Sequence, residues 1–446
     1  NFDLMIIATA GHVDHGKTKL IEAITGVNSD RLPEEKNRGM SIDLGFAYHD
    51  LGNGVILNFI DVPGHERFIN NLLSGFSNVD LGLLVIAADD GPMPQTEEHL
   101  SILQLLQVKN CIIVLTKIDK VNQKRLDNVC CLIKKMMHKT IFSDAEIFHI
   151  SNKTSQGIDN LVSHLKIIAL NYHHKEVKGN FRLSVDRRFL VKGAGIVITG
   201  TVVSGEVSVG EELIHSKSGE SLKIRAIHSQ SKKSKNGIQG HRCSLNITGQ
   251  KITIDKISRG DWILSKNVFF VTNRLDAVLS ILKNEKKIFK HWTAIHLYLG
   301  SGNVTGRIAI LGSFSINPGE KKIVQLVLDK PVHAVFDDKF VIRDISSSRT
   351  IGGGYILDPF AKKNNNTNFR SIRSERLKLI SPNSSKIVLN NLLLHYIEGI
   401  GLKYFLMSRN LTASEFEKII EPLDIVTELY KKHKWLILKT NWICLQ

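Results

Sequence analysis

The chain has 446 residues, which is too long for a single hydrophobic core. Its composition, 42% hydrophobic and 23% charged, is ordinary for a globular protein. No apolar run approaches the roughly 20 residues of a membrane-spanning helix, and no basic stretch followed by an apolar one indicates a secretion signal, so we expect no membrane partner. The five cysteines form no Cys-x-x-Cys pair, which favours a reduced, cytoplasmic chain without structural zinc.

The chain is strongly basic. Its net charge of +16 arises from 59 lysines and arginines against 43 acidic residues. This excess is either a solvated surface without a ligand or a surface for a polyanion such as nucleic acid, which gains affinity by releasing counterions. Charge alone leaves both interpretations open.

Residues 5–170 alternate short apolar runs with polar turns and segments of helical period. This order indicates a mostly parallel sheet with crossover helices, and therefore an α/β domain. The apolar runs that predict strands are 5–10, 56–61, 82–88, 111–116 and 147–151.

A polar stretch at 171–179 ends this pattern, and short alternating runs with glycine-rich turns follow it. These runs predict two antiparallel β-barrels, residues 180–266 and 267–360. The expected strands are 181–185, 195–203, 212–215, 222–228 and 242–247 in the first barrel, and 304–311, 322–328 and 340–344 in the second.

The last segment, residues 370–446, follows an asparagine- and lysine-rich linker at 361–370 and changes class again. Its pattern predicts helices over 387–397 and 425–432, and Thr412 with Glu415 forms a capping box that opens another helix. Runs 435–438 and 442–445 around the turn 439–441 predict a β-hairpin. Three helices and a hairpin describe a winged helix, which either docks on nucleic acid or protein or is a structural cap.

The first predicted strand runs directly into a glycine-rich loop and then a helix. The loop matches the phosphate-loop pattern G-x-x-x-x-G-K-[ST] in the context that this pattern requires. Its backbone amides and the helix N-terminus can surround phosphates, Lys17 can contact the β- and γ-phosphates, and Thr18 can offer a hydroxyl to Mg²⁺. The loop consists of Gly11, His12, Val13, Asp14, His15, Gly16, Lys17 and Thr18.

The second predicted strand ends in an Asp-x-x-Gly motif, Asp61 to Gly64. The Asp61 carboxylate can hold the shell of the Mg²⁺ ion, and the Gly64 amide can bond the γ-phosphate. Alone, this motif marks a turn, but its distance from a phosphate loop indicates the second half of a nucleoside triphosphate site.

The fourth strand ends in Thr116-Lys117-Ile118-Asp119. The Asp119 carboxylate can accept both the N1–H and the exocyclic amine of guanine, which adenine does not present, and Lys117 can cover the base. The alternative is that Asp119 caps a helix. The usual first residue of this motif is asparagine, so Thr116 ties the loop to the phosphate loop less fully. After the fifth strand, the backbone amides of Ser151, Asn152 and Lys153 can complete the base pocket.

These motifs together resemble the translational GTPases, of which elongation factor Tu is the familiar member. The strings at 11–18, 61–66 and 90–96 carry this resemblance. The segment 30–45 is similar to the first switch of the selenocysteine-specific elongation factors and differs from elongation factor Tu after its Arg-Gly. The barrel strings at 185–187, 191–195, 242–246, 259–262 and 343–345 also resemble the selenocysteine-specific family.

The resemblance implies GTP and GDP as ligands and Mg²⁺ held by Thr18, Ser41 and Asp61. Ser41 stands where the family usually has threonine. A serine hydroxyl can make the same bond, but its rotamer is freer without the methyl group, so we expect slower hydrolysis.

The resemblance also implies roles in hydrolysis for His65, Val13 and Met40. His65 is expected to orient the attacking water, and Val13 with Met40 to form an apolar gate that holds His65 away beforehand. The alternatives are that His65 is an exposed turn residue and that Met40 belongs to the core.

The partners that the resemblance implies are selenocysteinyl-tRNA and the ribosome, with delivery at recoded UGA codons. We expect a monomer. Only one winged helix is visible, so a hairpin in the mRNA is an expected partner only if the natural chain continues beyond residue 446.

Three charged residues of the first barrel match the pocket for the selenocysteinyl group by resemblance. In that pocket, Arg187 and Arg242 face the selenolate, and Asp186 orients a guanidinium. A selenol is more acidic than a thiol or hydroxyl, so a fixed positive charge in a partly dry site can select it. The alternative is a surface ion-pair cluster that only supports the barrel.

Two other functions remain open from the sequence. The first is an elongation factor Tu-like carrier of ordinary aminoacyl-tRNA. The second is a shortened protein that binds nucleotide and RNA without efficient turnover, for which Ser41, Thr116 and the short C-terminal part are the grounds.

Overall fold

The computed structural model describes most of the chain, which forms two compact units. The first unit comprises Asn1–Glu176 with Gly300–Gly302, and the second comprises Val177–Leu299 with Asn303–Gln446. Within the described residues, no helix is long and apolar enough to cross a membrane. The described residues are 3–30, 35, 41–52, 54–64, 71–73, 79–172, 176–230, 232–363, 367–381, 384–421, 423–430 and 433–445.

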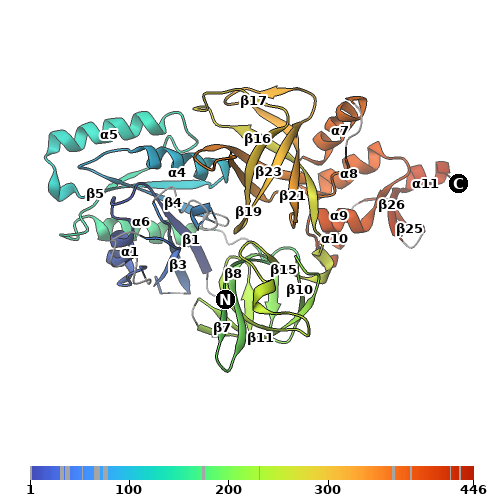
Figure 1. Ribbon diagram of the computed structural model, residues 1–446, viewed down its shortest axis with the longest axis horizontal. Coiled ribbons are helices and arrows are strands. Elements are labelled where there is room, and N and C mark those ends of the chain that lie inside the picture. Colours follow the sequence, from blue (N-terminus) through green and yellow to red (C-terminus); the bar gives the residue numbers. More distant parts are fainter. Residues whose placement is uncertain are drawn as a thin grey trace. The chain divides into compact units, whose positions relative to one another are not determined.

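The first unit is built on a six-stranded sheet in the order β2-β3-β1-β4-β5-β6, of which β1, β3, β4 and β5 are labelled in Figure 1. All neighbouring strands are parallel except β2 and β3. All residues of β3 and β4 are buried, as expected of strands covered on both faces. The five predicted strands are present, and the antiparallel edge strand β2 is an addition. The bounds are β1 Asp3–Ala10, β2 Gly45–Asp50, β3 Val55–Asp61, β4 Leu81–Ala87, β5 Asn110–Thr116 and β6 Ile147–His149.

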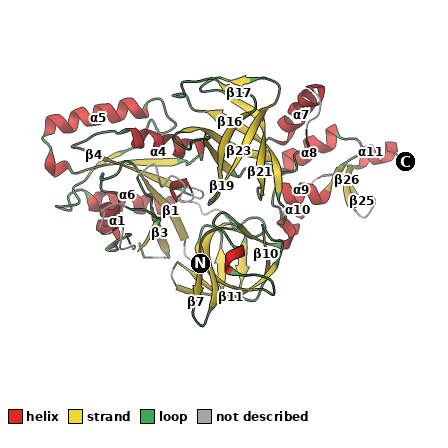
Figure 2. Cartoon of the chain, viewed as in Figure 1, coloured by secondary structure: helices red, strands yellow, loops and turns green. Residues whose placement is uncertain are grey.

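Helices cover both faces of this sheet (Figure 2). On one face, Ile21 of α1 and Leu161 of α6 join Ile7 of β1 in one core cluster. On the other face, the Leu103 side chain of α4 packs against Gly82 of β4. The phosphate loop therefore lies at the carboxyl end of β1, where α1 begins. The bounds are α1 Lys17–Thr25, α4 Pro94–Leu105, η2 Ile118–Lys120, α5 Gln123–Met137 and α6 Ile158–Asn171.

The second unit begins with an antiparallel barrel. Strands β10, β15, β7, β8, β14 and β11 pair in that order, and pairing of β10 with β11 closes the ring. The five predicted strands are present. The three-residue strands were not predicted, because so short a run has no readable alternation. The bounds are β7 Arg182–Val191, β8 Gly195–Ser204, β9 Glu206–Ser208, β10 Glu212–His215, β11 Ser221–Ser229, β12 Lys232–Ser234, β13 Asn236–Ile238, β14 Arg242–Thr248 and β15 Trp262–Leu264.

A second closed barrel follows, in the order β16-β21-β19-β18-β22-β23. Gly354 of β23 is required there, because a Cβ on it would lie 1.8 Å from the carbonyl oxygen of Val278 on β16. The three strands predicted for this barrel are β19, β21 and β22. The bounds are β16 Thr272–Ile281, β17 Phe289–Lys290, β18 Thr293–Leu299, β19 Gly302–Ile310, β20 Ser315–Ile316, β21 Lys321–Val332, β22 Lys339–Asp344 and β23 Thr350–Asp358.

The C-terminal part combines helices with a three-stranded sheet, β24-β26-β25. The helix predicted near 387–397 is α8, and the predicted capping box is present: the Thr412 hydroxyl accepts from Glu415 N at 3.2 Å, and Glu415 accepts from Thr412 N at 2.8 Å. The bounds are α7 Thr367–Ile380, α8 Ser385–His395, β24 Ile400–Gly401, α9 Leu402–Ser408, α10 Ala413–Ile420, β25 Ile425–Tyr430, β26 His433–Leu438 and α11 Lys439–Leu445.

Three predictions for this part are wrong. Residues 425–430 form strand β25, not a helix, and pair with β26. Ile425 and Leu429 are spaced like a helical face, but the β-branched run Ile425, Val426 and Thr427 is stiff at χ1 and favours a strand. The hairpin is therefore β25–β26, and 439–445 is helix α11 rather than its second strand. The linker expected at 361–370 is shorter, because α7 begins at Thr367.

The C-terminal part is bonded to both barrels of the second unit. Asn410, between α9 and α10, accepts from Asn180 N at 3.0 Å and donates to the Ser204 hydroxyl at 2.9 Å. Arg373 of α7 is ion-paired with Asp276 of β16, and both side chains are buried. These buried polar contacts make the last segment an integral part of the second unit.

The Asp276–Arg373 pair predicts a pH-dependent stability. Burial raises the pKa of Asp276 to about 6 from 3.8, although the Arg373 charge opposes the rise. The folded state therefore binds more protons between these two values, and stability falls as the pH rises through this window. We expect Arg373→Met to lower the free energy of unfolding by about 3–5 kcal/mol at pH 7.5, because it leaves a buried charge unpaired.

The loss should be clearly smaller at pH 5, where protonation neutralises the carboxyl. Urea unfolding at the two pH values measures the difference. The control is the double variant Asp276→Asn/Arg373→Met, which removes the buried charge and should be equally stable at both. An equal loss at pH 5 and pH 7.5 in the single variant would show that Asp276 does not carry the effect.

Candidate functional site

The phosphate loop 11–18 joins the end of β1 to the start of α1, and its two glycines have backbone angles that glycine tolerates best. Gly11 has a φ of 132° and Gly16 a φ of 88°. A Cβ on Gly11 would lie 2.1 Å from the carbonyl oxygen of Val85. Glycine at this position therefore lets the loop pack directly on β4.

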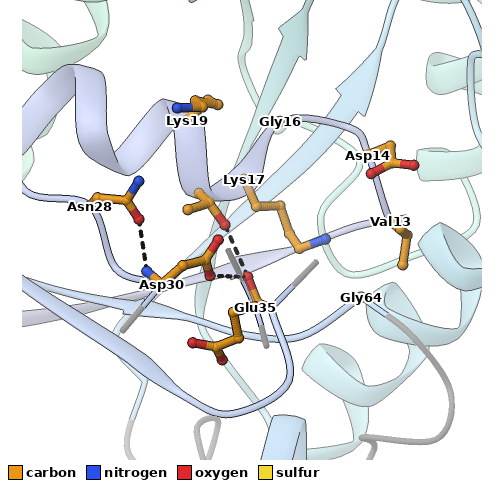
Figure 3. A pocket seen from close by; sticks show the side chains of 11 residues that line it. Val13, Asp14, Gly16, Lys17, Lys19, Asn28, Asp30, Glu35 and Gly64 are labelled. Atoms are coloured by element: carbon orange, nitrogen blue, oxygen red, sulfur yellow. Dashed lines mark hydrogen bonds between the residues drawn. The ribbon is translucent and has the colours of Figure 1, made fainter. Parts of the chain in front are cut away.

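Lys17 is the first residue of α1, and its ammonium group turns back over the loop toward Val13 and Gly64 (Figure 3). Its Nζ donates to the carbonyl oxygens of His12 at 2.7 Å and Gly11 at 3.1 Å. Burial lowers the pKa of Lys17 to about 8, although the charge of Asp61 opposes this. A phosphate group in the loop would favour the charged ammonium, because an opposite charge nearby stabilises it.

Four oxygen-bearing side chains meet beside Lys17. The Thr18 hydroxyl donates to Asp61 at 2.6 Å and lies 3.0 Å from the Ser41 hydroxyl. Ser41 donates in turn to Asp30 at 2.8 Å. Burial raises the pKa of Asp30, and the nearby negative charge of Asp61 adds to this. Hydroxyl and carboxylate oxygens are the ligands that Mg²⁺ prefers, so the set fits this ion.

A cavity of about 460 Å³ opens beside the loop, within the usual size range of small-ligand sites. Gly64 lies at its wall, and a Cβ there would lie 2.7 Å from Lys17 Nζ and 2.8 Å from Val13 N. Glycine at 64 thus leaves the approach to the loop open. The residues that line the cavity are Val13, Asp14, Gly16, Lys17, Thr18, Lys19, Asn28, Asp30, Glu35, Ser41 and Gly64.

Helix α4 supports the loop through two side chains that sequence reasoning missed. Gly11 N donates to His99 Nδ1 at 2.9 Å, and Val13 N donates to Gln95 Oε1 at 3.2 Å. Burial holds the pKa of His99 well below its usual range, so its ring is neutral and can accept this bond. Gln95 and His99 are four residues apart, so they share one face of α4. The four-residue spacing of these two polar side chains, shortly after Asp90, is the sequence feature that could have predicted their contact with the loop.

Glu35 is a second residue that sequence reasoning missed. It is buried, and its carboxylate accepts from the backbone amides of Ile42 at 3.0 Å and Asp43 at 3.0 Å. Asn71 donates to the carbonyl of Ile42 at 2.8 Å. These bonds restrain the backbone directly after Ser41, while the Ser41 hydroxyl itself is oriented by its bond to Asp30.

The residues predicted to contact the base lie at the ends of β5 and β6. The Ser151 hydroxyl donates to the Asp119 carboxylate at 2.6 Å, and this bond lowers the pKa of Asp119. Lys117 has a left-handed backbone and lies 3.5 Å from Asp89. Lys153 is exposed, and its charge also lowers the pKa of Asp119. The carboxylate is therefore ionised and oriented, as recognition of guanine requires.

The same two loops reach the phosphate loop. The Thr116 hydroxyl donates to the carbonyl oxygen of His15 at 2.7 Å, and Asn152 Nδ2 donates to that of Gly16 at 3.3 Å. Burial lowers the pKa of His15 to about 4, which keeps its ring neutral beneath the loop. Two predicted residues, His65 and Met40, lie outside the described residues, so only Val13 of the expected gate can be placed.

The three residues predicted for the selenocysteinyl pocket lie in the first barrel. Arg242 of β14 makes a two-point bond to Asp186 of β7, with both N–O distances 3.0 Å, and donates to the Thr199 hydroxyl at 3.2 Å. Thr199 also donates to Asp186. Arg187 is half-buried on the neighbouring position of β7, opposite Thr199 of β8. These bonds hold the Arg242 guanidinium in one orientation. Both a selenocysteinyl pocket and a structural ion-pair cluster would require this, so the geometry does not choose between them.

The fold and the site define a phosphate-loop nucleotide-binding protein of the translation elongation-factor class. A family model described as the elongation factor Tu GTP binding domain matches residues 3–170. A second model, the β-barrel domain of the selenocysteine-specific elongation factor, matches residues 276–363.

Relatives refine this class. The chain is 41% identical over 353 residues to the selenocysteine-specific elongation factor of Escherichia coli, covering 79% of this chain and 55% of the relative. It is 30% identical to that of Methanocaldococcus jannaschii, covering 70% and 68% of the two chains. The chain belongs to the selenocysteine-specific elongation factor family, and it spans just over half the length of the Escherichia coli relative.

Solved structures agree with this assignment. A crystal structure of the bacterial selenocysteine-specific elongation factor EF-Sec superposes with a TM-score of 0.80 at 29% identity, over 97% of this chain and 69% of that one. The translation elongation factor SelB from Methanococcus maripaludis, in complex with the GTP analogue GppNHp, gives a TM-score of 0.68 at 27% identity, over 80% of each chain.

The geometry at Asp119 predicts a change of nucleotide choice. We expect Asp119→Asn to weaken GTP binding about 100-fold, because two charge-assisted bonds to guanine are lost. The same variant should gain affinity for xanthosine triphosphate, whose 2-oxo group can accept from the new amide. Competition against a fluorescent guanine nucleotide measures both.

Ser151→Ala serves as the matched control, since it loosens the Asp119 carboxylate without changing its hydrogen-bonding character. It should weaken GTP binding only a few-fold and give no gain for xanthosine triphosphate. Binding of ATP as tight as that of GTP by the unchanged chain would refute the guanine assignment.

Proposed function

We propose that this chain binds GTP with Mg²⁺, carries selenocysteinyl-tRNA to recoded UGA codons on the ribosome, and hydrolyses GTP there. The single observation that carries the proposal is the cluster of Lys17, Thr18, Ser41 and Asp61 beside the phosphate loop, in a chain of the selenocysteine-specific family. The match of residues 276–363 supports this carrier over a carrier of ordinary aminoacyl-tRNA. We expect a monomeric, cytoplasmic protein.

In the proposed site, Thr18, Ser41 and Asp61 would hold the metal ion, which when bound would supply charge neutralisation on the β- and γ-phosphates. Lys17 and the loop amides hold the phosphates. Ser41 lacks the methyl group of threonine, but its bond to Asp30 restrains the hydroxyl, and so offsets part of the rotamer freedom.

Hydrolysis joins a water oxygen to the γ-phosphorus and breaks the bond from that phosphorus to the oxygen that bridges to the β-phosphate. In our proposal His65 orients the water, and Val13 with Met40 keeps His65 away until the ribosome is engaged. After the γ-phosphate leaves, the segments around Ser41 and Gly64 lose their contacts to it, and the carrier changes state.

The second unit is proposed to hold the tRNA. Domains are expected at 5–170, 180–266, 267–360 and 370–446, with the aminoacyl end of the tRNA on the first barrel. For the last domain we propose a winged helix, supported by helices α8, α9 and α10, which share one hydrophobic core cluster with Leu436 of the β24-β26-β25 sheet. Arg187, Arg242 and Asp186 are proposed to receive the selenolate.

A direct test of turnover uses His65. We expect His65→Ala to lose ribosome-stimulated hydrolysis by about 100-fold or more, because an unpositioned water reacts poorly, while GTP binding is unchanged. Multiple-turnover phosphate release with ribosomes and equilibrium binding of a fluorescent GTP analogue measure the two properties. A parallel loss of binding would indicate that His65 has a structural role.

A second test uses the charge of the selenolate. We expect Arg242→Ala to weaken binding of selenocysteinyl-tRNA about tenfold or more, with little effect on the weak binding of seryl-tRNA, since only the former carries the negative charge. Arg242→Lys keeps the charge but loses the two-point bond to Asp186. Its affinity for selenocysteinyl-tRNA should therefore lie between those of the unchanged chain and of Arg242→Ala.

Filter binding of both tRNAs in the GTP-bound state gives the ratio, and thermal unfolding gives the stability. If both tRNAs lose affinity equally, or only the unfolding temperature falls, the cluster is a structural ion pair and the pocket assignment fails.

A further inference from the structure

Two side chains from different loops bond to consecutive carbonyl groups of the phosphate loop. The Thr116 hydroxyl, at the end of β5, donates to His15 O at 2.7 Å, and Asn152 Nδ2, just after β6, donates to Gly16 O at 3.3 Å. The two reach the same point, because an added Cβ on Gly16 would lie 3.1 Å from Asn152 Nδ2 and 3.8 Å from Thr116 Oγ1.

The position of the Gly16 carbonyl determines the direction of the backbone amides that follow it. Gly16 has a φ of 88°, and its carbonyl also accepts the first helical bond of α1 from Leu20 N at 2.9 Å. The amides that follow it, at Lys17 and Thr18, are those at the helix N-terminus that can face a phosphate. A side chain that holds the Gly16 carbonyl therefore holds the start of α1 and the direction of these amides.

Stability does not account for asparagine at 152. Its Oδ1 is buried and has no partner among the described residues. A buried amide oxygen without a bond opposes folding, and one bond of 3.3 Å offsets this only weakly. A small apolar side chain would fit the position at least as well, so the amide is explained better by its contact with the loop.

The residue next to Asn152 points to the other half of the site. Ser151 donates to the Asp119 carboxylate at 2.6 Å, and Thr154 N donates back to the Ser151 hydroxyl at 3.2 Å. One short turn thus bonds the proposed base-binding carboxylate through Ser151 and the phosphate loop through Asn152. A nucleotide whose base contacts Asp119 and whose phosphates contact the phosphate loop would therefore have both contacts connected by this turn.

We propose that the Asn152 side chain is a positioning residue which, with Thr116, links the base-binding loops to the phosphate loop and slows release of the nucleotide. It supplies the second donor that asparagine at position 116 would supply and that threonine, with one hydroxyl proton, does not. The inference rests on the proposed binding of guanine nucleotide. It concerns the side chain of Asn152 and not its backbone amide.

The experiment compares dissociation of a fluorescent GDP from the full chain and from Asn152→Ala, by chase with unlabelled GDP. We expect release to be about 3- to 10-fold faster in the variant, the effect of one hydrogen bond. The preference for guanine over xanthine nucleotide should be unchanged, because Asp119 and Ser151 remain. The unfolding temperature of the nucleotide-free protein should not fall.

Rescue gives the sharpest comparison. Asparagine at 116 is longer than threonine and can reach the Gly16 carbonyl, so Thr116→Asn should restore slow release in the Asn152→Ala background. The matched control is Asn110→Ala, an exposed asparagine at the opposite end of β5, which should release GDP like the unchanged chain.

The proposal is overturned if Asn152→Ala releases GDP at the unchanged rate, if Thr116→Asn fails to restore the rate, or if the variant only lowers the unfolding temperature. Failure of the proposed function is distinct: the unchanged chain would then retain no guanine nucleotide, which would overturn this inference together with the function on which it rests.

Discussion

The nucleotide site depends on one buried carboxylate, that of Asp61 at the end of β3. It is fully buried, and it accepts hydroxyl bonds from Thr9 at 3.0 Å, Thr18 at 2.6 Å and Ser29 at 2.6 Å. These hydroxyls come from β1, from the start of α1 and from the segment before the first switch. A buried carboxylate must be satisfied by donors or by a cation, and here it has gathered three donors around the proposed metal position. The positions of the start of α1 and of Ser29 both follow from this requirement.

The parts of the fold that the sequence predicts well are those with a strong local signal. Short, largely apolar runs such as β3 and β4 favour strands buried on both faces, and the phosphate-loop pattern places its residues through glycine stereochemistry. The parts it misses depend on partners distant in sequence. Gln95 and His99 support the loop across more than 80 positions, and Glu35 acts on backbone amides rather than on a motif. The error at β25 has the same origin, because Ile425 and Leu429 suit a helix until pairing with β26 makes them a strand.

The charges of the site oppose those of the whole chain. The protein is strongly basic, yet Asp30, Glu35 and Asp61 lie close together at the nucleotide cavity. Their mutual repulsion raises the pKa of Asp30, beyond the effect of its burial. A divalent cation would relieve this repulsion, and the ammonium of Lys19 relieves it in part. The basic excess is therefore carried by the rest of the chain, where a polyanionic RNA is the partner that we propose.

Two departures from the family pattern, Ser41 and Thr116, share one physical consequence. Each places a shorter or less substituted side chain where the family usually has a fuller one, and each loses a restraint or a donor. In both cases a neighbouring polar side chain contacts the same position: Asp30 accepts from the Ser41 hydroxyl, and Asn152 donates beside Thr116. The partnerless buried amide oxygen of Asn152 and the half-buried carboxylate of Asp30 both oppose folding, so stability of the fold does not explain these two side chains. Their contacts with the phosphate loop and with Ser41 are what a nucleotide-binding site uses, which favours a chain that binds its nucleotide over one that has lost this binding.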